Sequence, residues 1–150
     1  MKVYNPRSIA PPNGPYSHGI EMPPNCRVLW LAGQTGMGPD GRSSESFEEQ
    51  CVQVFENIQA ILAEAGMRMT DVVKFMALVT KHEYLPKLRE IRSRYTGDHK
   101  PASTTFVVPS LVRPEWLVEI EAIAMKPVAT ARKAVKRTTA KRAAKRRRHR

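Results

Sequence analysis

The sequence has few of the residues on which metal binding, disulfides and serine nucleophiles depend. It contains two cysteines, Cys26 and Cys51, and its four histidines lie far apart, with no C-x-x-C or H-E-x-x-H pattern. The G-x-S-x-G pattern of a serine nucleophile is also absent. These absences argue against a metal site and against a serine hydrolase. We expect both cysteines to be free thiols in a reducing compartment.

Long apolar runs are absent as well. No run approaches the roughly 20 residues that a membrane-spanning helix needs, and the N-terminal M-K-V-Y-N-P lacks the apolar segment of a secretory signal. We therefore expect a cytoplasmic protein. A length of 150 residues without an internal repeat predicts one folded domain.

Positive charge is abundant, but it is concentrated at one end. Residues 127–150 hold 11 of the 25 lysines and arginines and no acid, so the other 14 basic residues equal the 14 acidic residues of the body. We predict a domain over 1–126 and a tail over 127–150 that is disordered when free. The tail is either a solvated extension or a non-specific contact for nucleic acid.

Glycine is frequent in one stretch, between Gly33 and Gly41. Its spacing matches neither the G-x-x-x-x-G-K-[ST] of a phosphate-binding loop nor a G-x-G-x-x-G that opens a helix. Turn formation is the better interpretation of these glycines.

Hydrophobic periodicity predicts the element order β-β-α-β-α-β-β. The strands fall near 16–21, 27–32, 71–80, 102–108 and 116–125, with a short one near 2–4, and the helices near 46–65 and 83–95. Pro23, Pro24 and Asn25 predict a hairpin-type connection between the strands at 16–21 and 27–32. Ser46 with Glu49 fits a capping box at the start of the first helix, and Gly66 is its predicted stop. Helices separated by single strands imply crossovers within one mixed sheet, with both helices on one face. The other face would be left uncovered, which predicts association of subunits.

The last strand, W-L-V-E-I-E-A-I-A-M, carries two acids. Alternation places Val118, Ile120 and the alanines that follow on an apolar face, and Glu119 and Glu121 on the other. A carboxylate among large apolar residues must be solvated, paired or directed at a wet cleft. The pair is therefore either an ordinary half-exposed surface, or one of the two is a general acid/base.

Five motifs, taken in order, resemble the RidA family, the YjgF-type enamine/imine deaminases. They are G-P-Y-S-H-G at 14–19, L-A-G-Q at 31–34, N-I-Q-A-I-L-A-E-A-G at 57–66, D-V-V-K at 71–74, and P-A-S-T-T-F…V-E-I-E-A-I-A from 101. The resemblance covers about 1–126. It implies a chorismate-mutase-like α+β fold, a homotrimer, clefts between subunits, and cofactor-free hydrolysis of small enamines and imines.

The resemblance also implies site residues. Glu119 stands where the family has the glutamate that positions and deprotonates water, Tyr16 matches the cleft tyrosine, and Gly33 matches the backbone that contacts the ligand. Taken alone, Tyr16 is equally a packed aromatic beside a turn, and Gly33 a turn glycine.

One position departs from the family pattern. Deaminating members read P-A-R-S, with an arginine that clamps the substrate carboxylate, whereas this chain has Ser103 there. Ser103, Thr104 and Thr105 would line a neutral pocket suited to an uncharged ligand, so weak activity on 2-aminoacrylate is expected. Arg113 is a candidate to replace the lost arginine.

Three functions follow from these observations. The first is an imine or enamine hydrolase with Glu119 as general acid/base. The second is a non-catalytic module that binds small molecules in the same cleft. The third is association with nucleic acid through the tail.

Overall fold

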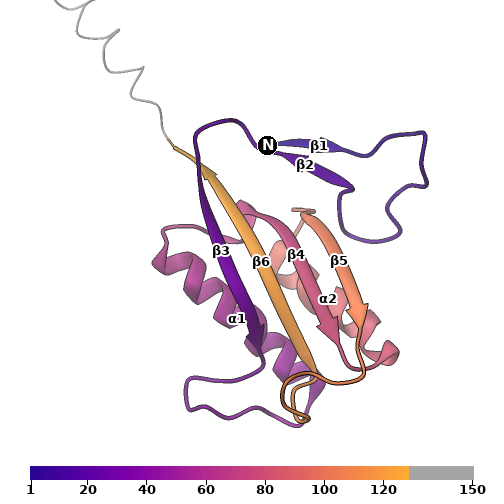
Figure 1. Ribbon diagram of the computed structural model, residues 1–150, viewed down its shortest axis with the longest axis vertical. Coiled ribbons are helices and arrows are strands. Elements are labelled where there is room, and N and C mark those ends of the chain that lie inside the picture. The colour runs from indigo at the N-terminus through magenta and orange to yellow at the C-terminus, as the bar shows by residue number, and fades with distance from the viewer. Residues whose placement is uncertain (129–150) are drawn as a thin grey trace, which may run out of the picture.

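The computed structural model describes residues 1–128 and has an α+β fold (Figure 1). Apart from Pro127 and Val128, the predicted tail lies outside the described residues, so its disorder and its partner stay predictions. The elements are β1 (Lys2–Tyr4), β2 (Gly19–Glu21), β3 (Cys26–Thr35), α1 (Phe47–Glu64), β4 (Val72–Val79), α2 (Leu85–Thr96), β5 (Ala102–Val107) and β6 (Val118–Pro127), with single 3-10 turns at Met69–Asp71 and His82–Tyr84.

The main sheet has the strand order β3-β6-β4-β5. Strand β6 is antiparallel to both of its neighbours, whereas β4 and β5 are parallel and are connected by α2. Both helices lie on the same side of this sheet (Figure 1). The predicted mixed sheet with helices on one face is therefore confirmed.

One predicted connection is wrong. The prolines before Cys26 suggested a hairpin between the second and third strands, but β2 pairs with β1 outside the main sheet, and β3 pairs with β6. The chain just before β2 is tied elsewhere, because Ser17 forms an isolated parallel bridge to Ala102. Pairing over such sequence distances depends on packing, which a local turn signal does not report.

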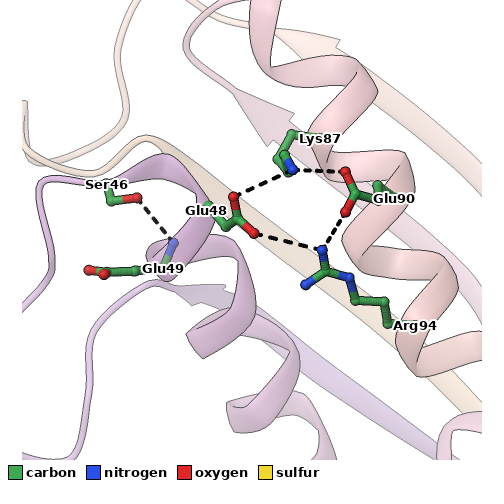
Figure 2. A network of polar contacts seen from close by, with 6 residues as sticks. All are labelled: Ser46, Glu48, Glu49, Lys87, Glu90 and Arg94. Carbon is green, nitrogen blue, oxygen red and sulfur yellow. Dashed lines mark hydrogen bonds and ion pairs between the residues drawn. The ribbon is translucent and has the colours of Figure 1, made fainter.

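Helix α1 has the ends that its sequence predicts. Ser46 is the N-cap, and its hydroxyl accepts a hydrogen bond from the Glu49 N–H at 3.4 Å (Figure 2). The capping box is half formed, since the Glu49 carboxylate accepts from the Ser44 hydroxyl. At the other end Gly66 has φ +66, and the bonds Gly66 N–H to Ala63 and Met67 N–H to Leu62 complete a Schellman motif.

The core lies between the helices and the sheet. The apolar face predicted for the last strand is buried, with Val118, Ile120, Ala122 and Ala124 each no more than 2% exposed. Other members of this core are Val54, Phe55, Ile58 and Leu62 from α1, Val72, Phe75, Ala77 and Val79 from β4, and Leu88 and Ile91 from α2.

Surface ion pairs connect α2 to α1 (Figure 2). Glu48 of α1 pairs with Lys87 at 3.4 Å and with Arg94 at 3.7 Å, and Glu90 pairs with both of these cations. Hydrogen bonds from Lys87 and then Arg94 lower the pKa of the Glu90 carboxyl. Because these groups are exposed, the network contributes little stability.

The sheet face away from the helices, here called the open face, is partly apolar. Alternation and register place Val28 and Trp30 of β3, Leu78 of β4, Phe106 of β5 and Glu119 of β6 on it. Trp30 is 75% exposed and Phe106 49% exposed. Within residues 1–128, neither helix is long and apolar enough to cross a membrane.

Candidate functional site

A pocket of about 600 Å³ opens at the β5 edge of the sheet. Its walls are β5, the start and middle of α2, and the loop before β2. The volume falls in the range of small-molecule sites. The lining residues are Asn13, Gly14, Pro15, Tyr16, His82, Leu85, Leu88, Arg89, Arg92, Ser103, Thr104, Thr105, Phe106 and Val107.

The G-P-Y-S-H-G segment forms one wall because Ser17 anchors it. The Ser17 hydroxyl donates to the Lys100 carbonyl at 2.7 Å, and its N–H donates to the Pro101 carbonyl at 3.3 Å. These bonds hold the segment beside the start of β5. Tyr16 then lines the pocket, and its hydroxyl lies 3.4 Å from Oδ1 of Asn13.

The three predicted hydroxyl residues all line the pocket, although they point to different sides of β5. Ser103 is in register with buried Phe75 and so faces the helices. Thr104 faces the other way, and its hydroxyl oxygen accepts a hydrogen bond from Nζ of Lys74 at 2.6 Å. Thr105 lies on the same face of β5 as Ser103.

The prediction of a neutral pocket at Ser103 is wrong, because two arginines of α2 line the pocket. Arg92 donates from Nη1 to the Ser103 hydroxyl at 2.8 Å and from Nη2 toward the Pro15 carbonyl at 3.5 Å. Arg113, the predicted replacement, instead lies over the Trp116 ring at 5.2 Å and is not part of the pocket lining.

Sequence reasoning missed Arg92, yet a signal for it exists. The apolar stripe of α2 includes Leu88, Ile91 and Tyr95, and Arg92 lies four residues after Leu88, on the same face. An arginine within a buried stripe is unusual, and this pattern marks Arg92 as a candidate site residue.

Glu119 lies elsewhere, on the open face and against Gly33. A Cβ added at Gly33 would come within 2.9 Å of Cγ of Glu119 and closer still to its carboxylate, so only glycine leaves this space. Glu119 is half-buried, whereas Glu121 is exposed. Within residues 1–128, none of the ion pairs or side-chain hydrogen bonds includes the Glu119 carboxylate.

The predicted residues therefore form two groups within one chain. Tyr16, Ser103 and Thr105 face the pocket beside α2, and Gly33 with Glu119 lies across the sheet on the open face. Glu119 and Phe106 flank Leu78 in register, so two strand spacings, roughly 10 Å, separate them.

Other reactive groups are poor candidates for chemistry. Burial, with a smaller contribution from Glu48, raises the pKa of the Cys51 thiol to about 12, which leaves it protonated and a weak nucleophile. Among the described residues, no cluster of three or more His, Cys, Asp or Glu side chains could hold a metal ion.

Comparison with known proteins matches this chain to the family described as endoribonuclease L-PSP, over residues 7–126. The chain belongs to this family, the RidA/YjgF family. A RutC family protein of Aquifex aeolicus is 39% identical over 119 residues, which cover 77% of this chain and 91% of the relative. The human 2-iminobutanoate/2-iminopropanoate deaminase is 31% identical over 121 residues, covering 79% and 85%.

The fold agrees with solved structures of the RidA/YjgF family. A Rid family protein from Yersinia pestis, whose function is described as unknown, superposes with a TM-score of 0.75 at 30% identity. The match covers 83% of this chain and 98% of that one. The resemblance stated from the motifs is thereby confirmed at the level of family and α+β architecture.

Proposed function

We propose that this protein hydrolyses a small imine or enamine in a cleft shared by two subunits of a homotrimer. The observation that carries the proposal is the half-buried carboxylate of Glu119, which lies over Gly33 without a partner in residues 1–128. A carboxylate in this setting suits proton transfer, since no architectural contact occupies it. Relatives named as 2-imino acid deaminases support the same reaction class.

The sharing of the cleft follows from the two groups of residues. Within one chain, Glu119 is on the open face and the pocket residues are beside α2, so one copy does not bring them together. The open face also leaves Trp30 and Phe106 in solvent. A second copy packed on this face would cover the apolar side chains and carry a pocket edge to Glu119.

The reaction requires water and an acid/base group. Glu119 takes a proton from water as the oxygen adds to the C=N carbon, and it returns the proton to nitrogen. The carbinolamine then collapses: Glu119 takes the hydroxyl proton and passes it to nitrogen, the C–N bond breaks, its electron pair stays on nitrogen, and ammonia departs from a carbonyl product. Water and imine thus give ammonia and a ketone or 2-oxo acid, with no oxidant and no cofactor.

The decisive test compares Glu119→Gln with Glu121→Gln, its matched control two residues along the same strand. Ammonia release from 2-iminobutanoate, generated in solution, is followed above the spontaneous rate. Glu119→Gln should lower the catalysed rate by at least about 100-fold, because general acid/base catalysis supplies that much. Glu121→Gln should keep the wild-type rate. Wild-type activity in Glu119→Gln would reject the proposed role.

A binding module is the alternative that this experiment separates. If the wild-type protein binds 2-oxo acids but never accelerates hydrolysis of any imine, the cleft binds without catalysis. If Ser103 were the only group to contact the substrate carboxylate, turnover of 2-aminoacrylate would be weak. The rate with this three-carbon compound therefore tests whether another group replaces the clamping arginine.

The basic tail supports a second, separate function, association with nucleic acid. Residues 127–150 carry 11 cations and no acid, and such a segment binds phosphate backbones by releasing counterions. Binding of RNA and DNA by the full-length protein should weaken steeply between about 50 and 200 mM salt. Deleting 129–150 should abolish this binding. Because the family description names an endoribonuclease, the same samples are checked for intact RNA. Equal retention by the truncated protein would reject a role for the tail.

A further inference from the structure

Arg92 is a buried cation at the wall of the pocket. Its side chain comes from α2, and the residue is only 6% exposed. The partners of its guanidinium are the Ser103 hydroxyl at 2.8 Å and, more weakly, the Pro15 carbonyl at 3.5 Å. Both partners are neutral, so neither balances the charge.

No carboxylate in the described chain compensates this charge. The ion pairs found within residues 1–128 use other cations, and the pocket lining contains Arg89 and Arg92 but no Asp or Glu. Burial lowers the pKa of Arg92, and the neighbouring charge of Arg89 lowers it further. Buried charges in proteins are normally paired, and an unpaired one is costly.

The adjacent arginine of the same helix shows the usual arrangement. Arg94 is exposed and pairs with Glu90 and Glu48. Arg92 differs in being both buried and without an acid, and it faces an open volume that a ligand can enter. The missing counter-charge therefore points to an anion that arrives with the ligand.

Ser103 explains why Arg92 reaches this point. This chain has a small hydroxyl side chain at the position of β5 where the motif resemblance implies an arginine. The short side chain leaves space, and the Arg92 guanidinium fills it from the helix. The positive charge of the pocket wall beside β5 is thus supplied by the helix.

We propose that Arg92 is the residue that anchors the substrate carboxylate, so that this site takes small 2-imino acids and not neutral imines. The inference rests on the proposed function, whose substrate class it specifies. An oxyanion of either kind, carboxylate or phosphate, would satisfy one guanidinium. A carboxylate fits better, because the planar fork of a single buried arginine matches it with two parallel hydrogen bonds and equal charge. Arg89 is exposed, so no second buried cation is present for a phosphate dianion.

Binding to the full-length protein tests this directly, and it is independent of catalysis. The probes are 2-oxobutanoate, its neutral isostere 2-oxobutanamide, and inorganic phosphate, titrated at 150 mM salt by calorimetry. Arg92→Met should weaken 2-oxobutanoate binding by about 10- to 100-fold, the range expected for charge-assisted bonds. It should leave the amide unaffected. Arg94→Met removes the same charge from the same helix and is the matched control, so it should change neither.

The stability of the variants separates a ligand anchor from a structural strut. Removal of an uncompensated buried charge should leave the melting temperature of Arg92→Met equal to or above that of wild type. If that variant fails to fold, the double variant Arg92→Met/Ser103→Arg returns the guanidinium to the strand and should restore 2-oxobutanoate binding. Failure of that restoration would overturn the inference.

Three further results would contradict it. Unchanged 2-oxobutanoate binding by Arg92→Met would show that Arg92 is not the anchor. Equal affinity for acid and amide in the wild type would show a neutral site. Binding of phosphate that is tighter than that of 2-oxobutanoate and depends on Arg92 would assign another anion class.

If 2-oxobutanoate binds as expected but Glu119→Gln hydrolyses imines normally, the catalytic proposal fails and the anchor remains. If Glu119→Gln is inactive while Arg92→Met hydrolyses 2-iminobutanoate at the wild-type KM, the anchor fails and the catalytic proposal remains.

Discussion

At the scale of single residues, a glycine determines where a carboxylate lies. The absence of a side chain at position 33 leaves the space that Glu119 occupies. Because the atoms that a new Cβ would meet belong to a flexible side chain, Glu119 would move aside at small cost to the fold. Gly33 thus has a role in positioning Glu119 that differs from the turn formation suggested by the surrounding glycines.

Gly33→Ala should redirect Glu119 while the protein stays folded. We expect imine hydrolysis to fall by about 10- to 100-fold, since displacement of a catalytic group by about 1 Å has effects of this size. The melting temperature should change by no more than a few degrees. Steady-state kinetics and thermal unfolding give both readouts.

Gly19→Ala is the matched control for this substitution. A Cβ at Gly19 would meet Tyr4 at an ordinary contact distance of 3.6 Å, so neither rate nor stability should change. Unaltered kinetics in Gly33→Ala would show that the contact with Glu119 does not position the carboxylate.

At the scale of elements, one buried glutamine connects α1 to the start of β6. The side chain of Gln50 is fully buried, donates to the Ser44 carbonyl at 2.6 Å and the Glu115 carbonyl at 2.8 Å, and accepts from the Leu117 N–H at 2.9 Å. These three bonds satisfy part-buried backbone groups of the loops before α1 and β6. Leu117 directly precedes β6, so this contact also fixes where the strand that carries Glu119 begins.

Gln50→Leu should destabilise the protein by about 2–4 kcal/mol, because one part-buried N–H and two part-buried carbonyls lose their partners while the side-chain volume is kept. Urea denaturation measures the loss. The control is Gln53→Leu on the same helix, where the amide bonds only the Asn57 side chain, and a change under about 1 kcal/mol is expected there. A loss below 1 kcal/mol in Gln50→Leu would mean that the loop finds other partners.

The helix α2 has two faces with separate tasks. Its outer face carries the exposed ion pairs of Lys87 and Arg94 with Glu48 of α1 (Figure 2). Its inner face presents Arg92 to the pocket. The position of the guanidinium therefore depends on how the inner face of α2 packs, through Leu88 and Ile91, into the core.

At the scale of the whole molecule, the open face determines the expected assembly. Trp30, with Val28 beside it, leaves a large apolar surface in water on a single copy. Soluble proteins rarely leave such patches uncovered. The proposed homotrimer would cover this surface and complete the cleft with the same contacts.

Trp30→Asp should dissociate the assembly, because a charge would be buried at the contact. Light scattering coupled to size-exclusion chromatography measures the mass, and imine hydrolysis should be lost with the trimer. Ala60→Asp places the same charge on the exposed side of α1 and should keep both mass and activity. A monomeric wild-type protein that hydrolyses imines would contradict the shared cleft.

Several features follow from local sequence. The alternation in 116–125 predicted which side chains of β6 are buried, because a strand has a fixed period of two. The Ser46 cap and the Gly66 stop predicted the ends of α1, because helix termini need partners within a few residues. The order of the motifs predicted the family and the residues of the pocket wall.

Tertiary structure alone decided the strand pairing and the charge of the pocket. Strand β2 joins β1 and not β3, and Arg92 meets both Ser103 and Pro15, which is 77 residues away in the chain. The only replacement that the sequence offered was Arg113, in the loop before the last strand, and in the structure it lies over Trp116. The physical reason is reach: a side chain covers only a few ångströms, so the cation that enters a site is set by the packing of helix on sheet, and no local pattern records that packing.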